Sequence, residues 1–180
     1  AGSSEIGAAA VSSHTASLAG EDVIYDAVLK QYGAYRPRAT EEAIEVAYAA
    51  APRIFPVGKR IGLASISGGA GVLMADAATD YDLNVAEMPA DAQTEMKKLL
   101  PFASARNPVD ITAQVVNDMT LVTGFTKLML NQGKYDALVG FWASAGVVPE
   151  LGSAICKALA KAMEGQDNKL FIQSLFAGPE

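Results

Sequence analysis

The only histidine of the chain, His14, lies in a short segment of small hydroxylic residues. A neutral imidazole nitrogen is a competent nucleophile toward phosphorus, so His14 could carry a phosphoryl group. A helix is expected to begin near Glu21, and the unpaired N–H groups and dipole of a helix N-terminus favour an anion. We therefore take His14 as the candidate catalytic residue and Ser13 and Thr15 as candidate phosphate-binding residues.

Two considerations keep the assignment of His14 open. Glu21 and Asp22 fall in the first turn of the expected helix and would compete with a bound anion, which would then rest against the preceding segment. A histidine among small residues is also often only an exposed loop residue. The residue types alone leave both interpretations standing.

A second candidate phosphate site is the segment Ser67-Gly68-Gly69-Ala70-Gly71, which follows the apolar run 61–66 and precedes a helical stripe. Glycines allow close approach of the backbone to a phosphate, and the Ser67 hydroxyl can donate. We predict that all five residues bind phosphate. A dinucleotide site is the rival interpretation, since Glu87 ends the next expected strand, but Met74 replaces its third glycine. A tight turn without a ligand is the third interpretation.

The motif Asn107-Pro108-Val109-Asp110 is expected to form a loop between two strands, because Pro108 biases Asn107 away from helix. We interpret Asn107 and Asp110 as loop-supporting residues, with Asp110 able to anchor the glycine segment or to contact a ligand. Cys156 shares an expected helical face with small and apolar residues and is predicted to be a packed core thiol. Trp142 follows a strand and is interpreted as a packing residue, with substrate contact as the alternative.

Periodicity divides the chain into two regions. Residues 1–52 contain two amphipathic helices, one from Glu21 to Gly33 and one that Thr40 caps and Pro52 ends, and these alone cannot close a core. Residues 52–59 are predicted to be a linker. Residues 57–180 alternate strands with helices, which indicates an α/β flavodoxin-like, doubly wound parallel sheet lacking its last covering helix. The expected strands are 61–66, 83–87, 137–141 and 170–174, and the expected helices are 72–78, 90–100, 117–131 and 149–164.

Composition excludes several classes of protein. The formal net charge of −6 and the pI near 4.8 oppose nucleic-acid binding, which depends on clustered Lys and Arg. No apolar run reaches the roughly 20 residues that cross a bilayer, and no signal pattern begins the chain, so we expect a cytoplasmic protein. One cysteine and one histidine make a disulfide or a metal site unexpected.

Three motifs in order carry a family resemblance. Ser13-His14-Thr15-Ala16-Ser17-Leu18-Ala19-Gly20 resembles the Ser-His-Thr-Gly-x-Leu-Ala-Gly signature of NDP-forming (ADP-forming) acyl-CoA synthetases, which are related to succinyl-CoA synthetases. Residues 67–72 look like the Gly-Gly-Pro-Gly-Val turn of that family, and residues 107–110 are identical to its Asn-Pro-Val-Asp loop. Ala16 departs from the usual glycine, and Ile66 from a common asparagine.

The resemblance implies an acid–thiol ligase that interconverts acyl-CoA, ADP and phosphate with acid, CoA and ATP through a phosphohistidine at His14. Residues 1–52 would be the C-terminal part of one succinyl-CoA synthetase-like domain, and residues 57–180 most of a second. A CoA-binding Rossmann domain and an ATP-grasp domain, on the same chain or on another subunit, would complete the enzyme. CoA and ATP or ADP with Mg would serve the full-length protein.

The resemblance also implies that this chain alone is inactive and binds none of these cofactors tightly. An association of identical chains is left open. The alternative is a regulatory module that senses CoA or phosphate in a larger protein, such as a protein acetyltransferase, without covalent catalysis.

Overall fold

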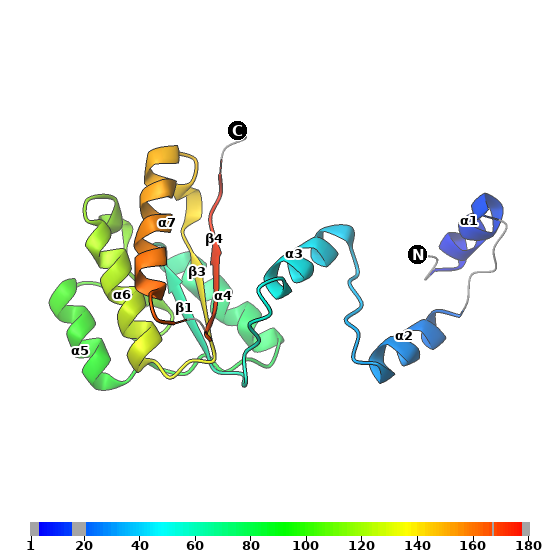
Figure 1. The fold of residues 1–180 in the computed structure, drawn as a ribbon, viewed down its shortest axis with the longest axis horizontal. Helices are drawn as coiled ribbons and strands as arrows, with labels where there is room; N and C mark the ends of the chain where they lie inside the picture. Colours follow the sequence, from blue (N-terminus) through cyan, green and yellow to red (C-terminus); the bar gives the residue numbers. More distant parts are fainter. Residues whose placement is uncertain (1–3, 16–20, 167, 178–180) are drawn as a thin grey trace. The chain divides into compact units, whose positions relative to one another are not determined.

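A computed structural model of the chain describes residues 4–15, 21–166 and 168–177. The chain divides into two units, Ala1–Ala51 and Pro52–Glu180. Within the described ranges, no helix is long and apolar enough to cross a membrane. The elements of the first unit are α1 (Glu5–Thr15), α2 (Asp22–Gln31) and α3 (Thr40–Ala50). Those of the second unit, shown in Figure 1, are β1 (Ile61–Ser65), α4 (Gly68–Asp80), α5 (Ala90–Leu99), β2 (Val109–Asp110), the 3-10 helix η1 (Ala113–Val116), α6 (Met119–Gln132), β3 (Ala137–Phe141), the 3-10 helix η2 (Ala143–Ala145), α7 (Pro149–Met163) and β4 (Leu170–Ser174).

The first unit has helices but no core. None of its described residues is buried, and the exposed apolar side chains include Val23, Ile24, Tyr25, Ile44 and Tyr48. The segment between α2 and α3 is held to both helices by polar contacts, since Arg36 pairs with Asp22 and Asp26 of α2 and the Tyr35 hydroxyl donates to Glu42 of α3. Helices α2 and α3 correspond to the two helices expected from the sequence. Ala39 precedes α3 as its cap, so the prediction that Thr40 caps this helix was wrong.

The second unit is built on a four-stranded sheet in the order β2-β1-β3-β4, with every pair parallel. The register runs from Ile61 opposite Ala137 to Ser65 opposite Phe141, and from Ala137 opposite Leu170 to Phe141 opposite Ser174. Parallel neighbours require crossover connections, which α4 to α7 supply. The α/β, flavodoxin-like class expected from the alternating pattern is confirmed.

One predicted strand is wrong. Residues 83–87 run beside β1 but contribute only a single bridge, between Arg60 and Asn84. Beyond that bridge, the side chain of Asn107 occupies the edge of β1 that a second strand would have used: its amide donates to the Ile61 carbonyl at 3.0 Å and its oxygen accepts from Leu63 N at 2.9 Å. Val109–Asp110, expected to lie in a loop, pairs with Ala64 and Ser65 as β2 instead.

The two faces of the sheet carry separate cores. On one face, Met74, Ala75 and Ala78 of α4 pack on Ile61, Leu63 and Val139. The other face is covered by α5, α6 and α7 (Figure 1). It carries the larger core, which includes Ala64, Leu138 and Trp142. Phe125, Met96 and Ile155 are each 0% exposed there. Each face must be apolar because parallel strands are covered on both sides.

A polar contact lies between β3 and β4 within the larger core. Trp142 is fully buried, and its indole Nε1 donates to Gln173 Oε1 at 2.6 Å. Gln173 pairs with Gly140 across the strands, and a Cβ on Gly140 would lie 2.1 Å from Gln173 Oε1. Because Gly140 has no side chain, the Gln173 amide has room to accept the hydrogen bond from the buried Trp142 indole.

The substitution Gly140→Ala tests this arrangement. The added methyl displaces Gln173 and leaves the Trp142 N–H without its acceptor, so we expect the free energy of unfolding to fall by about 1–3 kcal/mol. The measurement is urea unfolding of the 180-residue chain in a double-mutant cycle with Gln173→Ala, where the two changes should be strongly non-additive. Equal costs of Gly140→Ala with and without Gln173 would contradict this account.

Candidate functional site

His14 lies in the last turn of α1 and is exposed. The interpretation of His14 as an exposed loop residue is right about its exposure but wrong about the loop, because Glu5–Thr15 is continuous helix. Ser13 is exposed as well and donates from its hydroxyl to the Ala10 carbonyl at 2.9 Å, a backward hydrogen bond common for serine in helices. Residues 16–20, which include the departure at Ala16, lie outside the described residues.

The glycine segment is not a loop but the first turn of α4. Ser67 caps the helix in an extended conformation, its hydroxyl oxygen accepting from Ala70 N at 3.5 Å, and its own N–H donates to Ser65 Oγ at 3.0 Å. No residue in the described part of the chain accepts a hydrogen bond from Gly68 N or Gly69 N. These exposed N–H groups and the helix dipole suit an anion.

The glycines of this turn serve close packing rather than unusual backbone angles. None of Gly68, Gly69 and Gly71 has a positive φ. A Cβ on Gly71, which is buried, would lie 3.2 Å from Pro108 Cβ, and one on Gly68 would lie 3.1 Å from Asp110 Oδ2, whereas Gly69 faces open space. The Asn107–Asp110 motif thus packs directly against the turn.

The structure brings the two predicted loop-supporting residues to this turn in different ways. Asp110 ends β2, and its Oδ1 accepts from Thr112 N at 2.8 Å while Oδ2 faces Gly68. Asn107 has φ 105° and precedes a cis peptide bond to Pro108. Its amide spans from β1 to the Ala86 carbonyl, to which Nδ2 donates at 2.7 Å.

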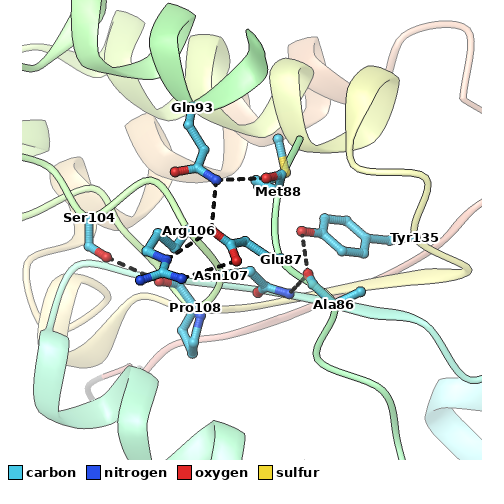
Figure 2. Close-up of polar contacts among 9 residues, drawn as sticks. All are labelled: Ala86, Glu87, Met88, Gln93, Ser104, Arg106, Asn107, Pro108 and Tyr135. Atoms are coloured by element: carbon cyan, nitrogen blue, oxygen red, sulfur yellow. Dashed lines mark hydrogen bonds and ion pairs between the residues drawn. The ribbon is translucent and has the colours of Figure 1, made fainter. Parts of the chain in front are cut away.

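A polar network beside Asn107 was not predicted from the sequence. Glu87 faces the Arg106 guanidinium (Figure 2). Arg106 Nε and Nη2 donate to Glu87 Oε1 and Oε2 at 2.9 Å and 3.1 Å, and Gln93 also donates to Glu87 Oε1. Hydrogen bonds from Arg106 and then Gln93 hold the pKa of Glu87 below its usual value. A carboxylate engaged in this way gives no support to the rival role of Glu87 as a ribose ligand.

The network continues at Tyr135, whose hydroxyl donates to the Ala86 carbonyl at 3.0 Å (Figure 2). Tyr135 is 6% exposed, and burial raises its pKa to about 12. The Ala86 carbonyl therefore accepts from both Asn107 and Tyr135. No sequence spacing indicated this meeting, because Asn107 and Tyr135 are far from Ala86 along the chain.

Of the expectations for Trp142 and Cys156, one is confirmed and one was wrong. Trp142 is a buried packing residue, as interpreted. Cys156 is exposed, so its prediction as a core thiol was wrong: the buried face of α7 carries Gly152, Ile155, Ala158, Leu159 and Ala162, one position away from it. The described residues contain no group of three or more His, Cys, Asp or Glu side chains that could hold a metal ion.

Comparison with known proteins covers both units. Residues 61–177 match the family described as Ligase-CoA domain, and residues 1–50 match the family described as succinyl-CoA ligase like flavodoxin domain. The alpha subunit of acetate–CoA ligase [ADP-forming] II from Pyrococcus furiosus is 33% identical over 92% of this chain and 37% of its own length. A 4-hydroxybutyrate–CoA ligase [ADP-forming] from Nitrosopumilus maritimus is 27% identical over 98% of this chain and 26% of its own length.

A solved structure is similar over the whole chain. The dinucleotide forming acetyl-coenzyme A synthetase 1 of Ca. Korarchaeum cryptofilum, in complex with phosphate and ADP, matches with a TM-score of 0.81 and 30% identity over 100% of this chain and 38% of its own. The chain thus spans well under half the length of these relatives. The match over residues 61–177 covers more than half of the sequence, and the chain therefore belongs to the Ligase-CoA domain family.

Proposed function

We propose that this chain is part of an NDP-forming acyl-CoA synthetase and that His14 carries the phosphoryl group. The observation that supports the proposal is similarity along nearly the whole chain to proteins named ADP-forming ligases. Those relatives are ligases, which does not favour a regulatory sensing module.

The proposed reaction has three steps. Phosphate attacks the acyl carbon of the thioester, and the C–S bond breaks to give acyl phosphate and CoA. An imidazole nitrogen of His14 then attacks phosphorus, the P–O bond to the acyl group breaks, and the acid leaves as a carboxylate. A terminal phosphate oxygen of the nucleoside diphosphate finally takes the phosphoryl group, and the P–N bond breaks to restore His14.

The first turn of α4 is the proposed phosphate-binding element of this chain. Gly68 and Gly69 offer exposed N–H groups, and Ser67 offers a hydroxyl at the same helix end. Preorganised donors of this kind stabilise phosphate oxygens without reorganisation during the reaction. Ser13 and Thr15, beside His14, and Ala70 and Gly71, within the turn, complete the proposed set.

CoA, nucleotide and magnesium are proposed to bind to parts of the full-length protein other than the described residues. Those residues include no cluster of His, Cys, Asp or Glu suited to a metal ion, so no magnesium site is proposed on them. A CoA-binding domain and an ATP-grasp domain are the proposed partners, together with acyl-CoA and phosphate as substrates. The proposed location of the protein is the cytoplasm. Nucleic acid is not among the proposed partners.

Labelling with radioactive ATP and magnesium tests the role of His14 in the full-length protein. Wild type should acquire an acid-labile, base-stable phosphate, and His14→Ala should acquire none, because a phosphoramidate needs the imidazole nitrogen. His14 is exposed, so the substitution should change the free energy of unfolding by less than about 0.5 kcal/mol. Ser12→Ala, on the same exposed helix end, is the matched control and should keep the label. An unlabelled wild type would refute the proposal.

Alanine substitutions in the α4 turn separate phosphate binding from folding. Gly69→Ala meets no atom within 4 Å and should not destabilise the chain, yet its methyl group stands beside the free N–H groups and should slow turnover about tenfold. Gly71→Ala presses on Pro108 and should also cost about 1 kcal/mol of stability. Steady-state kinetics and urea unfolding measure both effects, with Thr79→Ala near the other end of α4 as the control. Normal turnover in Gly69→Ala would remove the α4 turn from the mechanism.

A further inference from the structure

We infer that Asn107 is a positioning residue, whose carboxamide holds Pro108 against Gly71 and so sets the place of the phosphate-binding turn of α4. The inference rests on the proposed function and adds Asn107 to the residues on which phosphate binding would depend. The Asn107 side chain hydrogen-bonds to Ile61, Leu63 and Ala86 rather than to the free N–H groups of the α4 turn. Its effect would pass through Pro108, its covalent neighbour.

The Asn107 carboxamide makes three hydrogen bonds. Nδ2 donates to the Ile61 carbonyl at 3.0 Å and to the Ala86 carbonyl at 2.7 Å, and Oδ1 accepts from Leu63 N at 2.9 Å. Two donors and one acceptor, at fixed spacing, are what an Asn side chain supplies. Aspartate has the same shape but would place a carboxylate oxygen against two carbonyl oxygens.

The backbone of Asn107 also fits this role. Its φ of 105° is a conformation that most residues with a side chain avoid and that asparagine tolerates better than others. The three hydrogen bonds hold the residue in it, as expected where the surrounding structure determines a strained conformation. Loss of these bonds would therefore let the backbone at 107–108 relax.

A change in the backbone at Asn107 would displace α4 through Pro108, which packs against Gly71. The proline ring fixes φ at residue 108 and permits little internal adjustment. Pro108 Cβ lies so close to Gly71 that an added Cβ there would be 3.2 Å away, and Gly71 is buried. Val109, the next residue, is 0% exposed and paired to Ala64, which holds the far side of the motif. A change at residue 107 is thus carried mainly toward the α4 turn.

Tyr135 supplies a matched control. Its hydroxyl donates to the same Ala86 carbonyl at 3.0 Å, so Tyr135→Phe removes one hydrogen bond from the same strand-like segment. The Tyr135 ring packs beside Gly62 and Gly133 rather than beside the α4 turn. If Asn107 had only a structural role, Asn107→Asp and Tyr135→Phe would differ in the loss of stability. They would not differ in the KM for phosphate or in amide exchange at the α4 turn.

The first measurement is kinetic and uses the full-length protein. Asn107→Asp should raise the KM for inorganic phosphate about tenfold while the KM for ADP stays unchanged, because displacement of preorganised donors weakens phosphate binding. Tyr135→Phe should leave both KM values unchanged. Gly71→Ala pushes on Pro108 from the other side and should reproduce the rise in phosphate KM, which keeps the test decisive if Asn107→Asp does not fold. An unchanged phosphate KM in both Asn107→Asp and Gly71→Ala overturns the inference.

The second measurement does not depend on activity and uses the 180-residue chain. Gly71 N donates to Ser67 O at 3.0 Å within the turn, so its amide exchange reports how well the turn is held. We expect about tenfold faster exchange at Gly71 in Asn107→Asp than in Tyr135→Phe. Equal exchange in the two variants overturns the inference. An inactive wild type combined with faster exchange in Asn107→Asp alone would instead show that the proposed function, and not the positioning, is wrong.

Discussion

The insertion of one carboxamide into the edge of β1 is the interaction on which the second unit depends. Asn107 occupies the Ile61 carbonyl and the Leu63 N–H, two backbone groups that a neighbouring strand would otherwise pair. Buried backbone groups must be paired, so an edge without a strand needs a substitute. The substitute comes from the segment that leads into β2, and the sheet therefore gains its next strand from residues 109–110 rather than from residues 83–87.

The same segment determines how α4 begins. Pro108 packs on Gly71, and Asp110 faces Gly68, so two glycines of the turn are explained by the residues that lie against them. Of the three glycines that begin α4, only Gly69 faces open space, and within this described turn its N–H group and that of Gly68 are free. A glycine-rich turn after a parallel strand can thus combine two requirements in neighbouring residues: close packing on the inner side and access for an anion on the outer side.

The first unit differs physically from the second. None of its described residues is buried, and the segment between α2 and α3 is held to these two helices by the Arg36 pairs with Asp22 and Asp26 and by the Tyr35–Glu42 contact. Arg36 holds the pKa of Asp22 below its usual value. Ion pairs that remain accessible to solvent contribute little to stability, so the apolar side chains of α2 and α3 would need further protein surface to form a stable domain.

The sequence by itself determined the periodic elements and the chemistry of the candidate residues. Helices α4 to α7 and strands β1, β3 and β4 follow from local patterns of period 3.6 or from short apolar runs, and the motifs around His14 and Gly69 follow from residue identity. The tertiary structure alone decided which segment pairs with β1, which face of α7 is buried, and that Glu87 pairs with Arg106. The reason is separation along the chain. Periodicity indicates which residues can be buried, but it does not indicate the partner of an edge carbonyl such as that of Ile61, which here is Asn107, 46 positions away.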